Sequence, residues 1–180
     1  MSTDVFLYDR TQGVFTLISQ RLNNLANADA VAPDISADGQ AICFVSADDS
    51  FVHGDTNAKR DIFVYHDGAI QRCSIASDGT QADADSGVPR LNASGRFVVF
   101  VSRAGNLVPG VGNGRSQVFL YDREGGRLEA ISVDGTGAPA DGDCFVPEIS
   151  PGGRYVTFVS KATNLVNGVN GDWYQVYRAD

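Results

Sequence analysis

The sequence predicts an all-β fold built from a repeated four-stranded unit, and its composition and an internal repeat are the observations that predict it. Asp outnumbers Glu by 19 to 3, and 20 glycines accompany them in a chain of 180 residues. Asp and Gly favour tight turns, whereas Glu favours helix interiors, so this composition predicts many turns and few helices. Apolar residues form 43% of the chain and charged residues 20%, which are ordinary values for a globular domain.

The internal repeat spans the whole chain. The tripeptide Phe-Val-Ser occurs at 44–46, 100–102 and 158–160, so successive copies lie 56 and 58 residues apart. A proline precedes each copy by 11 residues, and segment 4–9 resembles segment 61–66, which lies 57 residues later. The repeat therefore predicts one module over 1–180. Its units are expected at 1–29 (partial), 30–85, 86–143 and 144–180 (partial).

Each unit holds four short strand candidates, a to d in chain order, separated by turn residues. The predicted strands are 31–36, 88–92 and 145–150 for a; 41–46, 97–102 and 155–160 for b; 4–9, 61–66, 117–122 and 174–178 for c; 14–19, 70–76 and 128–133 for d. The a–b and c–d hairpins carry glycine, which supplies the positive φ of tight turns. These dipeptides are Gln12-Gly13, Asp38-Gly39, Asp67-Gly68, Ser94-Gly95, Gly125-Gly126 and Gly152-Gly153.

Strands b and c are nearly continuous apolar runs, which is typical of strands covered on both faces. Segments 42–45, 62–65 and 97–101 show this pattern. A four-stranded meander covered on both faces by copies of itself is the blade of a β-propeller. We therefore predict an all-β propeller of four-stranded antiparallel blades, about three blades per chain. Phe44, Phe100 and Phe158 share one position on strand b and should be buried between blades.

The strand count bears on closure of the ring. The order c-d, a-b-c-d, a-b-c-d, a-b-c gives three blades and one surplus strand c, whereas propellers have four to eight blades. An open arc would leave apolar faces on both terminal blades, and such faces demand a partner. The expected partner is a second copy, head to tail, in a six-bladed homodimer; the alternative is the remainder of a longer propeller. Segments 4–9 and 174–178 would then compete for one place, and we expect 4–9 to take it because its continuation supplies strand d.

These residues resemble the TolB-type, WD-like β-propeller repeats of bacteria, in a longer-repeat subgroup with a period of about 57. The matching segments are 33–39 followed by strand 41–46, 54–57, 61–64, 106–108 and 164–166. The resemblance implies a propeller fold and an accessory role in a secreted or periplasmic bacterial protein. It says little about function, because propellers host binding, scaffolding and catalysis alike.

Charge and cysteine content exclude several classes of function. The net charge of −8 argues against nucleic acid as a partner, because phosphates demand a basic patch. No run approaches the length of a membrane span, and residues 1–4 do not look like a signal peptide. Cys43, Cys73 and Cys144 are odd in number and never spaced as C-x-x-C, so we interpret them as free structural thiols.

One loop has the spacing of a metal site. Asp55, Asn57 and Asp61 place hard oxygen side chains at positions 1, 3 and 7 of the loop between strands b and c. Calcium takes such oxygens from tight loops, so these residues are the candidate ligands of a calcium ion. The alternative is an Asx turn closed by its own side chains. No other cofactor is predicted.

The loops between strands d and a are rich in aspartate. They contain Asp78, Asp83, Asp85, Asp134, Asp141 and Asp143. We interpret these as solvated turn residues and predict a non-catalytic module that binds a protein or carbohydrate through its loops. The alternatives are a carbohydrate- or peptide-active enzyme using carboxylates such as Asp85 and Asp141, and a calcium-stabilised spacer. Trp173 is expected to be a packing anchor.

Overall fold

The chain folds into thirteen strands arranged in four antiparallel sheets across residues 2–22 and 28–180, which a computed structural model describes. The fold is therefore all-β, as predicted. The strands are β1 (Phe6–Asp9), β2 (Val14–Leu17), β3 (Ala30–Ile35), β4 (Ala41–Ser46), β5 (Asp61–His66), β6 (Ala69–Arg72), β7 (Ser86–Leu91), β8 (Phe97–Ser102), β9 (Gln117–Asp122), β10 (Arg127–Ala130), β11 (Cys144–Ile149), β12 (Val156–Ser160) and β13 (Gln175–Ala179).

The sheets are consecutive meanders that match the repeat. The sheets β3-β4-β5-β6 and β7-β8-β9-β10 are complete four-stranded blades, here called blades 1 and 2. The sheet β11-β12-β13, blade 3, lacks a strand d, and the N-terminal hairpin β1-β2 supplies only strands c and d. The predicted order of strands along the chain is confirmed.

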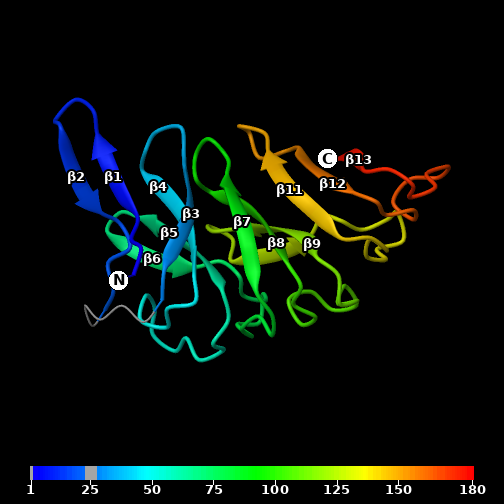
Figure 1. The fold of residues 1–180 in the computed structure, drawn as a ribbon, viewed down its shortest axis with the longest axis horizontal. Helices are drawn as coiled ribbons and strands as arrows, with labels where there is room; N and C mark the ends of the chain where they lie inside the picture. The colour runs from blue at the N-terminus through cyan, green and yellow to red at the C-terminus, as the bar shows by residue number, and fades with distance from the viewer. Residues whose placement is uncertain (1, 23–27) are drawn as a thin grey trace.

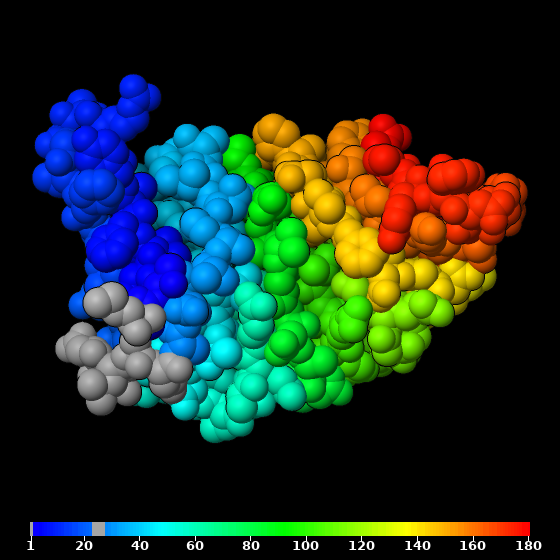
Figure 2. Space-filling model, in the orientation of Figure 1, coloured from blue at the N-terminus to red at the C-terminus, as the bar shows by residue number. Residues whose placement is uncertain are grey.

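The blades stand side by side in an arc, with β3, β7 and β11 in contact along its inner side (Figure 1). The N-terminal hairpin and blade 3 lie at opposite ends of this arc, as the space-filling view also shows (Figure 2). Apolar side chains fill the space between neighbouring sheets in three buried clusters. Packing of sheet against sheet, rather than of sheet against helix, therefore supplies the core.

The equivalent phenylalanines of strand b are buried, as predicted. Phe44 and Phe100 are 0% exposed and Phe158 is 3% exposed. Each ring stacks on the aromatic ring opposite it on strand c, with centroid distances of 5.6, 5.8 and 5.4 Å. The partners are Phe63, Phe119 and Tyr177. One aromatic pair per blade is thus a repeated element of the core.

The inner strands carry a bulge that the sequence did not predict. The pairing of each inner strand with strand b shifts register next to Ala32, Val88 or Val146. These residues have φ of 52°, 53° and 49°, and each precedes a proline. Positive φ is unfavourable for a β-branched side chain, so the bulge is a strained feature repeated in every inner strand. All three side chains are exposed.

The outer strands are shorter than predicted, and a serine hydroxyl explains why. Strand β6 ends at Arg72 rather than at residue 76, because Ser74 Oγ accepts the hydrogen bond of Ile62 N–H at 2.9 Å. In the same way, Ser132 Oγ accepts the hydrogen bond of Val118 N–H at 2.9 Å. Ser19 Oγ accepts that of Val5 N–H at 3.0 Å. The side chain replaces a backbone acceptor, so the ladder between strands c and d stops early.

Both ends of the arc expose apolar side chains, as an open arc requires. On the N-terminal hairpin Phe6, Tyr8, Phe15 and Leu17 are 56%, 48%, 71% and 41% exposed. In blade 3 Val176 and Trp173 are each 76% exposed. The expectation that Trp173 is a packing anchor is therefore wrong for this chain, because no neighbouring blade covers it. The described part of the chain has no helix that is long and apolar enough to span a membrane.

Candidate binding site at the inner strands

The predicted calcium ligands come together around an arginine. Arg72 Nη1 lies 2.9 Å from Asp55 Oδ1 and 3.9 Å from Asp61 Oδ2. Asn57 turns its amide nitrogen toward Asp61 Oδ2 at 2.9 Å, while its Oδ1 accepts the N–H of Lys59 at 3.1 Å, which is the Asx turn. Burial raises the pKa values of Asp55 and Asp61, and Arg72 opposes this rise. A guanidinium therefore supplies positive charge between the two carboxylates.

Two of these three residues have counterparts in other repeats. Asp61 accepts the hydroxyl of Ser74; Gln117 accepts that of Ser132 at 2.6 Å, and Asp4 accepts that of Ser19 at 2.9 Å. Asn113 repeats Asn57, since its amide nitrogen donates to Ala140 O at 2.9 Å as that of Asn57 donates to Ala82 O at 3.1 Å. The hydroxyl contact thus recurs in three repeats and the asparagine contact in two. No group of three or more His, Cys, Asp or Glu side chains suits a metal within residues 2–22 and 28–180.

Calcium binding at Asp55, Asn57 and Asp61 stays a prediction with a direct test. A ligand that binds only the folded state raises the melting temperature by mass action. Because Arg72 already places a positive charge beside both carboxylates, we expect the melting temperature to be the same in excess chelator and in excess calcium. A calcium-dependent rise that the Asp55→Ala variant loses, while an Asp134→Ala control in the d–a loop of blade 2 keeps it, would instead establish the calcium site.

The aspartates of the d–a loops tie loops together. Asp85 Oδ1 accepts the N–H of Arg60 at 3.0 Å, and Asp143 Oδ1 accepts that of Ser116 at 2.7 Å. Asp83 Oδ1 accepts the N–H of Gly105 at 2.7 Å. The hydroxyl and the N–H of Thr163 donate to Asp141 at 2.6 Å each, and they lower the pKa of this carboxyl. A general acid needs a raised pKa, so the lowered pKa of Asp141 does not favour it as the acid of the enzyme alternative.

The cysteines are free and buried, as predicted. Burial raises the pKa of Cys43 to about 12 and also raises the pKa values of Cys73 and Cys144. The thiolate is the reactive form, so these side chains act as small apolar core residues.

Two pockets adjoin at the ends of the inner strands, where the d–a and b–c loops meet. The larger, of about 430 Å³, is lined by the bulge residues Ala32 and Val88 and by Arg60 and Arg103. The smaller, of about 260 Å³, contains Arg115, Asp141, Asp143, Phe145, Lys161 and Tyr174. Arg103 and Lys161 are repeat equivalents, each following the Phe-Val-Ser tripeptide. Arg103 links the two pockets, since its Nη2 lies 3.9 Å from Asp143 Oδ2.

The pockets bring together four basic side chains and three aspartates, whereas the chain as a whole has a net charge of −8. Arg103 is 62% exposed, Arg60 and Arg115 are also exposed, and Lys161 lies over the ring of Tyr174 at 4.8 Å. Phe145 and Val146 add exposed apolar surface, at 37% and 56%. Sequence reasoning missed this site because it searched for carboxylates and metal spacings. The only available signal was the basic residue that follows Phe-Val-Ser in two of the three copies.

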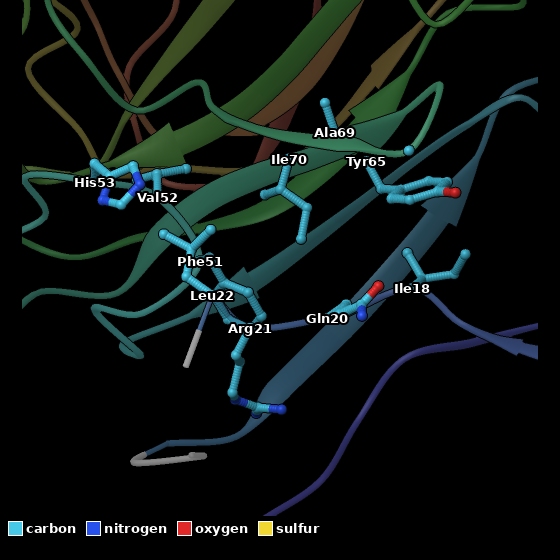
Figure 3. Close-up of a pocket in the computed structure, with 11 residues that line it drawn as sticks. Ile18, Gln20, Arg21, Leu22, Phe51, Val52, His53, Tyr65, Ala69 and Ile70 are labelled. Carbon is cyan, nitrogen blue, oxygen red and sulfur yellow. The ribbon is translucent and has the colours of Figure 1, made fainter. Parts of the chain in front are cut away.

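A third cavity, of about 440 Å³, lies elsewhere, between the N-terminal segment and blade 1 (Figure 3). Its lining is mostly apolar and includes Ile18, Phe51 and Ile70. The guanidinium of Arg21 points away from Ile70 in Figure 3 and forms ion pairs with Asp4 at 2.5 Å and Asp48 at 2.6 Å. The guanidinium of Arg21 therefore holds the N-terminal hairpin on blade 1 through these two ion pairs.

Comparison with solved structures identifies the fold. A candidate TolB from Agrobacterium tumefaciens is similar over 99% of this chain, with a TM-score of 0.58 and 18% identity. The β-propeller domain of the trilobed protease from Pyrococcus furiosus is similar over 98% of this chain, with a TM-score of 0.55 and 12% identity. The chain has a TolB-like β-propeller fold. No model of a known protein family and no curated protein sequence matches it.

This chain spans only about half the length of these structures, namely 53% of the Agrobacterium protein and 46% of the Pyrococcus domain. Enzymes are also among the similar structures. An oligogalacturonate lyase from Vibrio parahaemolyticus matches 97% of this chain and 41% of its own length, with a TM-score of 0.55 and 13% identity. At these identities the likeness concerns the fold, and the site must be argued from this chain's own residues.

Proposed function

We propose that this chain is a non-catalytic propeller module that binds a partner at the two adjoining inner-strand pockets. The strained bulge carries the proposal, because it holds Val88 at positive φ and exposed in a pocket that also contains Arg60 and Arg103. Strained backbone and exposed apolar groups beside convergent polar groups are typical of binding sites. The loop aspartates support a binding role, since they hold backbone N–H groups.

The chemistry of the pockets indicates what the partner carries. Three exposed arginines and a lysine lie beside apolar side chains, and the three aspartates of the pockets already accept backbone N–H groups. The basic groups therefore suit a segment with carboxylate groups next to an apolar or aromatic group. Arginine and aromatic residues are the side chains that most often dominate the energy of protein–protein contacts. We therefore favour an acidic protein segment, with an acidic oligosaccharide as the second candidate because of the basic charge alone.

The test measures binding of two probes. One is a library of immobilised peptides containing paired Asp or Glu next to an aromatic residue, and the other is a set of galacturonate oligomers. We expect selective binding of acidic peptides, weakened about tenfold by Arg103→Glu and by Arg60→Glu. Arg127→Glu is the matched control, because Arg127 is exposed on outer strand β10, and it should leave the affinity within about twofold.

Three results would contradict the proposal. They are equal binding of neutral and acidic probes, unchanged affinity in both pocket variants, and conversion of either probe to products. Binding of galacturonate oligomers alone, still sensitive to Arg103→Glu, would keep the site and change the class of partner.

A further inference from the structure

The two ends of the arc each lack what the other provides. Among the residues that the structure describes, β13 pairs with β12 alone, so blade 3 has a strand c and no strand d there. β1 pairs only with β2, so the N-terminal hairpin is a c–d pair without strands a and b. Both β1 and β13 therefore present an unpaired strand edge.

The hairpin sits in the position of strands c and d relative to blade 1. The N–H of Ala30 donates to Thr3 O at 2.9 Å, as that of Ser86 donates to Arg60 O at 2.7 Å at the next junction. Its tether from Val5 to Ser19 repeats the tethers in blades 1 and 2. The hairpin therefore occupies the position of the outer half of a blade, and strands a and b of that blade are missing from the described residues.

The exposed face of the hairpin is the face that the complete blades cover. By the repeat, Phe6 corresponds to Phe63 and Phe119, which are 0% exposed and stacked on a strand-b phenylalanine. Phe6 is 56% exposed, and Phe15, on the same face, is 71% exposed. Burial of such rings is favourable because it removes apolar surface from water. What is missing is a strand b with a phenylalanine in register.

The charges at the hairpin turn indicate which strand b fits. In blade 2, Arg96 at the start of strand b pairs with Asp122 at the end of strand c, with Nη2 and Oδ2 2.6 Å apart. Asp9 is the equivalent of Asp122, since both accept N–H groups of their own turn: Thr11 and Gln12 donate to Asp9 at 2.7 and 3.1 Å. The equivalent of Arg96 is Arg154 in blade 3, which pairs with Asp180 at 2.6 Å.

We propose that a second copy of this chain completes the ring: each copy's β1–β2 hairpin takes the c–d place beside the other's β12, with Phe6 against Phe158 and Asp9 against Arg154. The incoming β1 then displaces β13, because β11 pairs with one edge of β12 and a single strand c can pair with the other edge. Two such junctions close two arcs into six blades.

The geometry favours a second copy as the occupant. The hairpin and blade 3 lie at opposite ends of the arc, so the hairpin cannot reach β12 of its own chain (Figure 1). In blade 3, β13 holds the place of strand c, with Tyr177 stacked on Phe158 and Asp180 paired with Arg154. The hairpin offers an aromatic residue and an acid at the same two positions, together with the strand d that blade 3 lacks. A head-to-tail contact between copies is heterologous, and it forms a closed dimer when the rotation adds up to a full turn.

The test is the mass in solution of charge-reversed variants, measured by light scattering on the full chain. The unmodified chain should have twice its mass of 19.1 kDa at micromolar concentration. Asp9→Arg alone and Arg154→Asp alone place like charges at both junctions, and each should raise the dimer Kd at least about tenfold. Mixing the two variants restores opposite charges at both junctions, so the mixture should regain the dimer.

Controls separate assembly from folding. Phe6→Asp changes an exposed residue, so it should abolish the dimer and leave the far-ultraviolet circular dichroism unchanged. Glu129→Arg, on the outer strand of blade 2, should leave the mass unchanged. A monomer at all concentrations, which a longer propeller chain or another protein as the true occupant would give, overturns the proposal. Species larger than a dimer, or a mixture that stays monomeric, would also overturn it.

Discussion

The Phe100→Ala variant is expected to lose about 3–5 kcal/mol of unfolding free energy, the usual cost of emptying a buried phenylalanine site. Phe100 is 0% exposed and stacks on Phe119 at 5.8 Å, within the apolar cluster between blades 1 and 2. The backbone of β8 cannot move to fill the empty space, because hydrogen bonds hold it to β7 on one side and to β9 on the other. Urea denaturation followed by circular dichroism measures the loss.

Trp173→Ala is the matched control for this prediction. It removes a larger ring, but Trp173 is 76% exposed, so the unfolding free energy should change by less than about 0.5 kcal/mol. If both variants lost the same amount, the contact between blades at Phe100 would not be the source of stability, and the blade assignment would be in doubt.

The Arg21→Ala variant is expected to be destabilised by about 3–5 kcal/mol, because it leaves the carboxylate of Asp48 buried without its arginine. Arg21 Nε lies 2.6 Å from Asp48 Oδ2, and the side chains are 6% and 0% exposed. Arg21 also binds Asp4, so its loss should loosen the N-terminal hairpin from blade 1. Thermal unfolding combined with limited proteolysis would detect both effects.

Arg127→Ala removes an exposed ion pair and serves as the comparison. Arg127 and Glu129 are 77% and 46% exposed and 3.9 Å apart, so this change should cost no more than about 1 kcal/mol. If the Arg21→Ala and Arg127→Ala variants had the same unfolding free energy and the same resistance to protease, apolar contacts alone would hold the hairpin on blade 1.

The strand pattern was predictable because it rests on periodic, local signals. The Phe-Val-Ser landmarks placed β4, β8 and β12, and the Gly-containing hairpins took the expected positive φ, as at Gly39 and Gly95. The bulge was not predictable, since Val88 and Val146 prefer extended backbone before a proline and only the packing of inner strands imposes positive φ. The early end of the outer strands also depends on a side chain, Ser74, that acts across the sheet.

The candidate site was less predictable than the fold. Sequence spacing grouped Asp55, Asn57 and Asp61 correctly, but Arg72 joins them from the opposite strand, and its repeat position gave no hint. The basic pockets combine residues from two loops and an inner strand, such as Arg60, Arg103 and Val88. Such groups become neighbours only when blades stand side by side, so the basic residue after Phe-Val-Ser, Arg103 or Lys161, is the one trace of them in the sequence.

Amide hydrogen exchange at several protein concentrations shows whether one four-stranded unit accounts for every strand, including those of the incomplete blades at both ends. As concentration rises, the account predicts increasing protection over β1 (Phe6–Asp9), when it gains a neighbouring strand b, and decreasing protection over β13 (Gln175–Ala179), when it yields its place. Strands of blades 1 and 2 should stay unchanged. Protection of β1 and β13 that is the same at all concentrations would contradict the account.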